Sequence, residues 1–526
     1  MSVLRFFFVI LRGNFIGMTI TELQQQYAAH PNMVVMKRLL KDTSVQTVFC
    51  GGLCASAASL FSSVLVQEGG CPFVFILGDL EEAGYFYHDL TQILGTERVL
   101  FFPSSFRRSI KYGQKDAANE ILRTEVLSRL QKGEEGLCIV TYPDALAEKV
   151  VSRKELSNKT LKLNVGEKVD TTFITDVLHS YGFEYVDYVY EPGQYAVRGS
   201  IIDVFSFASE YPYRIDFFGD EVESVRTFEV ESQLSREKKD GVSIVPDLAV
   251  TGDVTTSFLD FIPKETTLAM RDFLWLRERI QVVHDEALTP QAIAVQEAEE
   301  NGGITLEGKL IDGSEFAVRA LDFRRLEFGN KPTGTPNASV TFNTSAQPIF
   351  HKNFDLVASS FKDYLEKGYS LYICSDSMKQ TDRIKAIFED RGDKINFTPV
   401  ERTIHEGFVD NTLRLCIFTD HQLFDRFHKY NLKSDKARSG KVALSLKELN
   451  QFTPGDYVVH TDHGIGRFSG LVRIPNGDTT QEVLKLVFQN EDVVFVSIHS
   501  LHKVSKYKGK EGEAPRLNKL GTGAWE

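Results

Sequence analysis

The sequence predicts a multidomain protein of α/β and α+β domains that ends in a small β-barrel domain. Strand-like and helix-like segments alternate between residues 47 and 142, and again between 354 and 419, which is typical of sheets covered by helices. Residues 149–235 change to a mixed pattern with antiparallel strands. Residues 454–501 contain only short strands separated by glycine turns, as small barrels do.

Length and charge limit the classes of function. A chain of 526 residues is too long to fold around a single hydrophobic core, so we expect several domains. A composition of 42% hydrophobic and 25% charged residues is ordinary for a globular protein. The formal net charge is −12 and the sequence pI is about 5.6. Proteins that mainly bind nucleic acid usually carry a basic surface, so this balance favours protein partners.

The cysteines and the N-terminus indicate a cytoplasmic location. No Cys-x-x-Cys pair occurs, and the cysteines lie mostly in apolar runs, which predicts reduced core thiols: Cys50, Cys54, Cys71, Cys138, Cys374 and Cys416. An apolar run over residues 3–11 is interrupted by Arg5 and is too short to cross a membrane. We expect residues 1–18 to be an extension before a true start near Met18, with a signal peptide as the weaker alternative.

The first α/β domain is expected over residues 19–148. Its strands are predicted at 47–50, 73–77, 99–102 and 137–141, and its helices at 56–66, 80–94 and 118–130. Gly51 and Gly52 follow the first strand, where a nucleotide-binding domain has its phosphate loop. The loop lacks the lysine and the magnesium-binding hydroxyl of such loops, which predicts a degenerate loop that does not bind ATP.

An α+β insertion domain is expected over residues 149–235. It combines a strand at 161–165, a helix at 172–181 and an antiparallel sheet within 191–229. Side chains alternate between the two faces of a strand, so Tyr213, Ile215 and Phe217 share a buried face. Arg214, Asp216 and Phe218 share the other face, to which Arg198 also belongs. We expect this second face to be open to solvent and to be either an ordinary polar surface or a binding surface.

Four further segments complete the chain. Residues 236–349 are expected to complete the first module, with helices at 256–261, 272–281 and 290–301 and an exposed polar loop over 329–346. Residues 350–427 form a small α/β domain, with helices at 354–366 and 378–390 and strands at 370–374, 395–398 and 413–419. A basic linker follows over 428–450. Residues 451–526 form the β domain, with strands at 457–460, 466–472, 482–488 and 493–497.

Catalytic signatures are missing from the sequence. No Gly-x-Ser-x-Gly, His-Glu-x-x-His or phosphate-loop sequence occurs, so we expect no catalytic residues and no metal. The sequence HTDHG, from His460 to Gly464, suggests a metal or hydrolytic site, but it has no carboxylates spaced to complete one. A turn between strands is the favoured interpretation.

Three parts of the sequence resemble a known family. The stretch YEPGQYAVRGSIIDVF with YPYRIDFFGDEVESVRTFEVESQ resembles the insertion domain shared by UvrB and bacterial transcription-repair coupling factors. The stretch FTPGDYVVHTDHGIGRFSGL, with VFVSIHSLHKVSKY and LNKLGTGAWE, resembles the coupling factors specifically, where a Tudor/CarD-like domain binds RNA polymerase. HEGFVDNTLRLCIFTDHQLF is similar to the end of the family's third α/β domain.

The resemblance implies a non-enzymatic adaptor with two binding sites. It implies that UvrA binds Arg198, Arg214, Asp216 and Phe218, and that the β subunit of RNA polymerase binds Leu471, Ile474 and Leu484. The polymerase would pair with an exposed strand edge near Ile474. The resemblance also implies that the chain stops before lobes that use ATP and Mg to translocate on double-stranded DNA. We expect a monomer without a cofactor of its own; a UvrB-like ATPase and a damage-binding DNA-repair protein are the alternatives.

Overall fold

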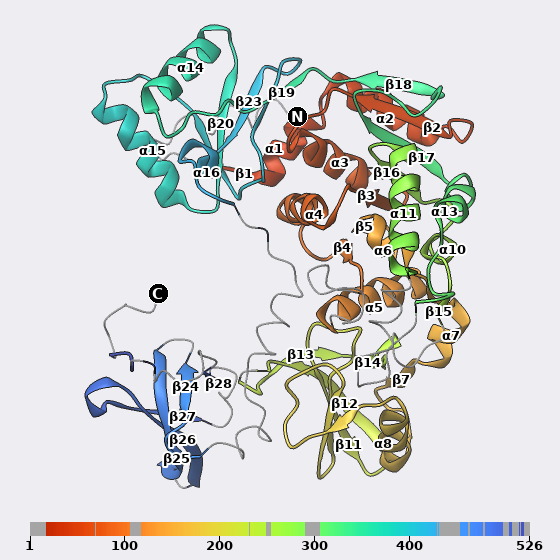
Figure 1. Ribbon diagram of the computed structural model, residues 1–526, viewed down its shortest axis with the longest axis vertical. Coiled ribbons are helices and arrows are strands. Elements are labelled where there is room, and N and C mark those ends of the chain that lie inside the picture. The colour runs from red at the N-terminus through yellow and green to blue at the C-terminus, as the bar shows by residue number, and fades with distance from the viewer. Residues whose placement is uncertain are drawn as a thin grey trace. The chain divides into compact units, whose positions relative to one another are not determined.

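In the computed structural model the chain divides into two compact units (Figure 1). One unit contains residues 1–115, 129–150 and 254–432, and the other contains residues 116–128, 151–253 and 433–526. The structure describes residues 17–68, 70–105, 117–230, 232–248, 254–289, 306–428, 430, 453–460, 463–476, 479–497, 504–507, 515 and 517–519. Within these residues, no helix is both long enough and apolar enough to cross a membrane.

The first unit contains the expected parallel α/β domain. Its seven strands are all parallel and lie in the order β18-β2-β17-β16-β3-β5-β4. Four of them come from the predicted strands: β2 (Thr47–Gly51), β3 (Phe73–Ile76), β4 (Val99–Phe102) and β5 (Cys138–Thr141). The helices of this part are α1 (Ile20–Tyr27), α2 (Pro31–Lys41), α3 (Ala57–Glu68), α4 (Leu80–Leu94) and α6 (Pro143–Ala147). The helix α5 (Ala117–Gln131) comes between β4 and β5 in the sequence, and most of its residues are assigned to the second unit.

The other three strands of this sheet correct the sequence prediction. They are β16 (Thr267–Met270), β17 (Arg324–Gly329) and β18 (Ala338–Thr341), from a segment in which we expected helices and a loop. β18 is an edge strand, so its polar sequence suits a strand with solvent on one side. The helix α10 (Phe258–Phe261) precedes β16, and the helices α11 (Phe273–Ala287) and α13 (Gly313–Ala320) lie between β16 and β17 in the sequence. The predicted helix at 290–301 falls outside the described residues.

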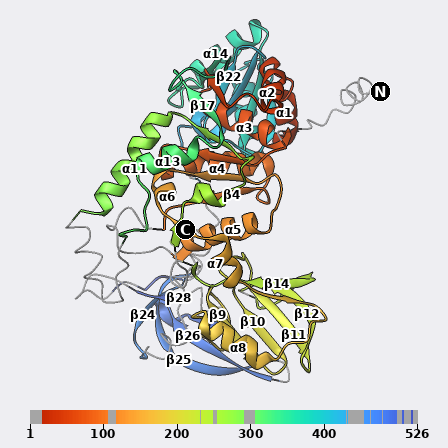
Figure 2. The ribbon, with the colours of Figure 1, turned by 90° about the vertical axis from the view of Figure 1, so that its right-hand side faces the viewer.

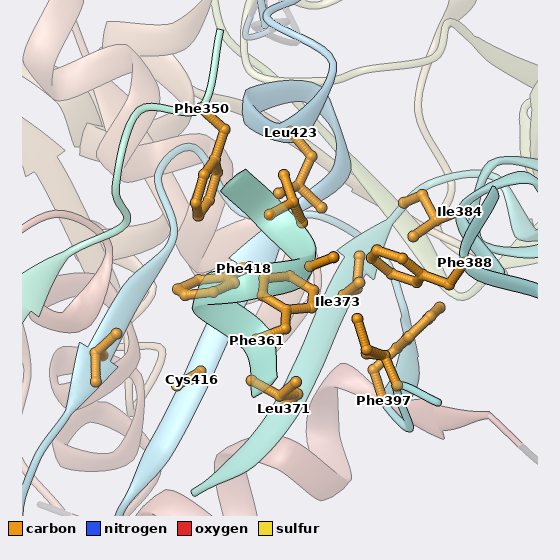
Figure 3. Close-up of a cluster of buried hydrophobic side chains, with 14 residues drawn as sticks. Phe350, Phe361, Leu371, Ile373, Ile384, Phe388, Phe397, Cys416, Phe418 and Leu423 are labelled. Atoms are coloured by element: carbon orange, nitrogen blue, oxygen red, sulfur yellow. The ribbon is translucent and has the colours of Figure 1, made fainter. Parts of the chain in front are cut away.

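The small α/β domain has a mixed six-stranded sheet in the order β1-β21-β20-β23-β22-β19. Its core is made by aromatic and aliphatic side chains of α14 (Phe354–Glu366), β20 (Ser370–Ser375), α15 (Met378–Asp390) and β23 (Leu415–Thr419) (Figure 3). β1 (Met18–Thr19), β19 (Thr344–Ala346) and β22 (Phe408–Asp410) complete it, with α16 (Asp420–Leu423) after β23. The strand predicted at 395–398 is instead β21 (Thr398–Glu401), because Ile395 and Phe397 pack into the core just before it.

The insertion domain in the second unit has a six-stranded sheet in the order β13-β12-β11-β10-β9-β8. The strands are β8 (Glu184–Tyr185), β9 (Gln194–Arg198), β10 (Ile201–Val204), β11 (Tyr213–Phe218), β12 (Glu221–Phe228) and β13 (Ser235–Lys239). The helix α8 (Thr171–Ser180) lies beside the strands of this sheet (Figure 2). Its Ile174 and Leu178 side chains belong to the same buried cluster as residues on one face of the sheet. β7 (Leu161–Asn164) pairs with β14 (Gly241–Ile244), so the domain continues past the expected boundary at residue 235, and α7 spans Arg153–Asn158.

The C-terminal β domain is an open sheet. Its strands lie in the order β27-β26-β25-β24-β28, and within the described residues the two end strands do not pair. Their bounds are Tyr457–His460 for β24, Gly464–Asn476 for β25, Thr479–Val487 for β26, Val493–Ser497 for β27 and Val504–Lys506 for β28. The β content was predicted correctly, but the structure does not show the predicted closed barrel.

Candidate partner-binding surfaces

The two faces of the insertion sheet differ as the strand parity predicts. Ile215 and Phe217 of β11 are buried against α8 together with Ile202, Val222 and Val225. Phe218, the next residue, is 80% exposed. The other face carries Arg198, Asp203, Arg214, Asp216 and Arg226, and we call it the polar face. Its exposed parts can contact a partner, because the opposite face is filled by the domain core.

Asp203 of β10 lies at the centre of the polar face and is fully buried. Its carboxylate accepts hydrogen bonds from Arg214 Nε to Oδ1 and from Arg214 Nη2 to Oδ2, both at 2.8 Å. Arg198 also donates to Asp203 through Nη2. A buried carboxylate needs such donors, since an unpaired buried charge is strongly unfavourable. Asp203 therefore holds both arginines in place from the strand between them.

The two arginines differ in what they present to a partner. Arg214 also donates to the Gln233 carbonyl at 3.1 Å and lies over the Phe228 ring at 4.5 Å, and only 14% of its side chain is exposed. The bond to Asp203 raises the pKa of Arg214 further. Arg198 lies 4.9 Å from the Tyr188 ring centroid and is 34% exposed. Arg214 is therefore largely a buried anchor, which corrects our expectation of a fully solvent-facing pair.

Asp216 and Phe218 occupy the exposed end of β11. Asp216 accepts a hydrogen bond from the Ser200 hydroxyl at 3.2 Å and lies 3.4 Å from Arg226 Nη2. A register shift between Asp216 and Phe217 marks a bulge, and bulges re-aim side chains at functional edges. The structure thus brings Arg198, Arg214 and Asp216 together, with the exposed Phe218 ring at the end of the same strand. The sequence reasoning did not name Asp203 or Arg226.

The C-terminal sheet has a partly unpaired edge along β25. Residues 464–467 of β25 pair with β24, whereas its residues from Leu471 to Asn476 pair only with β26 among the described strands. A register shift between Phe468 and Leu471, with Gly470 at φ +117°, separates the two parts. Leu471 is 40% exposed on this segment. An unpaired edge of this kind can accept a strand from another protein.

The three residues predicted for polymerase binding have different surroundings. Leu471 lies on the open edge, and Ile474 lies on the same strand segment, with its side chain outside the described residues. Leu484 is fully buried in the core of the C-terminal sheet with Phe468, Leu486 and Phe488. We therefore exclude Leu484 from the predicted contact surface, because its side chain is buried in the domain core and is not accessible to a partner.

Two backbone amides of the glycine loop after β2 already have hydrogen-bond acceptors within the protein. Cys54 N donates to the Thr344 hydroxyl at 3.0 Å, and Ser56 N donates to the Glu406 carbonyl at 3.3 Å. A Cβ on Gly52 would lie 2.0 Å from the Phe342 carbonyl oxygen, so a neighbouring segment already fills the space at the loop. A phosphate loop needs open N–H groups and a lysine. The geometry supports a degenerate loop.

A cleft of about 720 Å³ lies beside this loop, where the strands β2, β3, β16 and β17 end. Ligands of open α/β sheets bind at such strand ends. The charged side chains that line the cleft are mostly acidic: Asp79, Glu81, Glu82, Asp89, Glu406 and a single arginine, Arg271. Arg271 is engaged by Glu82 at 2.6 Å. This lining repels phosphates.

The HTDHG sequence lies between two strands. β24 ends at His460 and β25 begins at Gly464, whose φ of +77° is a turn conformation that favours glycine. The His460 and His463 rings stack at 4.6 Å. Across the residues for which coordinates are given, no group of three or more histidine, cysteine or acidic side chains could hold a metal ion.

Comparison with known proteins identifies both domains. Residues 161–249 match the family model of the UvrB interaction domain, and residues 452–508 match the CarD-like/TRCF RID domain. The first match covers the sheet with the polar face, and the second covers the sheet with the open β25 edge. The chain therefore resembles both domain families, each over a separate part of its sequence.

Over 90% of its length the chain is similar to transcription-repair-coupling factors. It is 23% identical over 549 residues to the Staphylococcus aureus (strain bovine RF122 / ET3-1) protein and 23% identical over 552 residues to that of Bacillus subtilis (strain 168). Each match covers 90% of this chain but 46% of the relative, so the chain spans about half the length of these proteins. The family resemblance stated from the sequence is confirmed.

Proposed function

We propose that the chain is the adaptor part of a transcription-repair coupling factor. Its C-terminal sheet binds the β subunit of stalled RNA polymerase, and its insertion domain recruits UvrA to begin nucleotide excision repair. The presence of a UvrB interaction domain and a CarD-like domain in one chain is the observation that carries this proposal. The whole protein, on this proposal, is an ATP-driven translocase on double-stranded DNA, with ATP and Mg bound outside residues 1–526.

The UvrA contact is proposed for the exposed part of the polar face. Arg198 offers a guanidinium on a rigid strand, and Asp216 lies on the same face. Phe218 offers an aromatic ring that is 80% exposed. Arginine and aromatic side chains on a fixed scaffold are the types that dominate binding energy at protein interfaces. Arg214 supports the surface through Asp203.

The polymerase contact is proposed for the open edge of β25. The backbone groups of the segment from Leu471 to Asn476 supply hydrogen bonds to an incoming strand, and Leu471 and Ile474 supply apolar contacts. Backbone pairing provides affinity in this binding mode, and the side chains provide specificity.

Binding measurements with the full chain and each purified partner test both contacts. Arg198→Ala is expected to abolish UvrA binding and to leave polymerase binding intact. Leu471→Arg and Ile474→Arg are expected to do the reverse, because each adds a charge at the strand edge. Each variant is thus the folding control for the other. UvrA affinity unchanged in Arg198→Ala, or polymerase affinity unchanged in both β25 variants, contradicts the corresponding assignment.

A further inference from the structure

Cationic side chains continue across the polar face beyond β11. In the sheet register Arg214 of β11 lies opposite Arg226 of β12, and Arg226 lies opposite Lys238 of β13. Directly opposed residues of antiparallel strands project to the same face, with Cβ atoms about 5 Å apart. Arg214, Arg226 and Lys238 therefore form a row of three cations across neighbouring strands, which we call the cationic row.

The cationic row is only partly neutralised. Asp203 compensates Arg214 but is shared with Arg198. Arg226 has one long contact, 3.4 Å from Nη2 to Asp216 Oδ2, and its buried Nε has no hydrogen-bond acceptor among the described residues. Lys238 is exposed, and within the described part of the chain it forms no ion pair. Like charges directly opposite each other destabilise a sheet, so this arrangement lowers the stability of the free domain.

The row is unusual in a chain with a net charge of −12. An acidic surface on a partner would supply the anions that the sheet itself lacks. A protein fits this face better than nucleic acid does, because residues 161–249, which include the row, match the family model of the UvrB interaction domain. The exposed Phe218 ring, opposite Glu221, also favours a protein surface with an apolar site.

We propose that Arg226 and Lys238 extend the docking surface for the protein that binds Arg198, by pairing with a strip of carboxylates on that partner. This inference rests on the proposed function and widens the site from β9 and β11 to the sheet edge at β13. Arg226, whose side chain is 31% exposed, gains a second anion for the outer part of its guanidinium, and Lys238 gains a counterion. Electrostatic complementarity of this kind raises the association rate and makes the affinity depend on salt.

The test measures the affinity of the full chain for purified UvrA over a range of salt concentrations. Arg226→Gln with Lys238→Gln is expected to weaken binding by about tenfold and to flatten the salt dependence, because two cations leave the interface. Lys239→Gln is the matched control. Lys239 lies opposite Val225, whose side chain is in the core, so it points to the other face and its removal leaves the affinity unchanged.

The outcomes separate this inference from the function on which it rests. Loss of binding in Arg198→Ala with unchanged affinity and salt dependence in the double variant overturns the cationic row alone. Unchanged binding in Arg198→Ala overturns the proposed function itself. If the double variant loses affinity for duplex DNA but retains that for UvrA, the row is a nucleic-acid surface and the inference is wrong. If Arg226→Gln lowers the thermal midpoint, the double variant is replaced by Lys238→Gln alone, which lies at an exposed edge position. Unchanged UvrA affinity and salt dependence in that single variant would then overturn the cationic row.

Discussion

Arg214 and Asp203 form a two-pronged ion pair across β10 and β11, with two N–O distances of 2.8 Å and a carboxylate that is fully buried. Arg198 reaches the same carboxylate from β9. Three strands are thus tied together beneath the surface proposed to bind UvrA. The pair links the stability of the insertion domain to the geometry of its binding face.

Removing the Arg214 side chain should destabilise the insertion domain. Arg214→Ala leaves Asp203 buried with only Arg198 as a partner, and breaking a buried pair of this kind costs about 3 kcal/mol. Hydrogen exchange on the full chain would detect this as faster exchange of the β10 and β11 amides. Arg198→Ala should have the smaller effect, since Arg214 still pairs with Asp203 through two bonds. Equal protection in both variants would show that Arg214 is not the anchor.

A cluster of histidines should make the first unit sensitive to acid. Burial lowers the pKa of His88, His405 and His421 to about 4, and their mutual repulsion and that of His428 add to the effect. His428 also has a lowered pKa and stacks on His421 at 4.4 Å. The groups facing the cluster include Asp376, Asp420 and Arg426.

The direction in which pH changes the stability follows from which state, folded or unfolded, binds more protons. Below pH 6.5 the unfolded chain binds protons on these imidazoles, whereas the folded chain does not bind them until about pH 4. The free energy of unfolding should therefore fall as the pH decreases from about 6.5 to 4. Urea unfolding of the full chain at several pH values measures the slope. His88→Gln should flatten it, while substitution of the exposed His351 by Asn should not; an identical slope in all three proteins would contradict this cause.

A glycine in α4 should be required for the contact with His428 and Tyr430. A Cβ on Gly84 would lie 2.4 Å from the Tyr430 ring, and the neighbouring Tyr85 hydroxyl donates to the His428 carbonyl at 2.9 Å. Gly84→Ala normally stabilises a helix, but here it should displace Tyr430. Trypsin cleavage between residues 426 and 433 should become several-fold faster. Gly334→Ala, at an exposed position with nothing near its Cβ, is the control, and equal cleavage rates would show that the contact is not needed.

Residues 1–526 alone should not bind ATP. The amides of Cys54 and Ser56 already have acceptors, and carboxylates line the adjoining cleft. A fluorescent ATP analogue at millimolar concentration with magnesium should give no saturable signal. Saturable binding that unlabelled ATP displaces would instead favour a UvrB-like nucleotide site.

Local patterns were sufficient for much of the fold and for part of the site. Strand parity placed Phe217 inside and Phe218 outside, because alternation depends only on neighbouring residues. The parallel direction of β2, β3, β4 and β5 was predicted correctly from the alternation of strands and helices, whereas their order in the sheet was not predicted. The strands β16, β17 and β18 were missed because their place in the sheet is set by strands that are distant in the sequence, such as β2, in which Thr47 lies opposite Arg325.

The burial and contacts of the site residues depend on long-range packing, so they could not be predicted from sequence patterns. Nothing local to Arg214 indicates that Gln233 and Phe228 cover it, or that Asp203 is shared with Arg198. Leu484 was selected by its position on a strand. Its side chain lies on the face that packs in the core with Phe468 and Phe488, and the choice of that face depends on the packing of the whole sheet. The cationic row likewise appears only once β12 and β13 are placed in register.

The adaptor role is tested most directly by mixing the chain with UvrA and RNA polymerase and measuring the masses of the complexes that form. The account predicts a complex that contains all three proteins. With Arg198→Glu it predicts only the complex of the chain with polymerase, and Lys162→Glu, at an exposed position on β7, should behave like the unchanged chain. A three-protein complex that persists in Arg198→Glu, or UvrA and polymerase that displace each other from the chain, would contradict it.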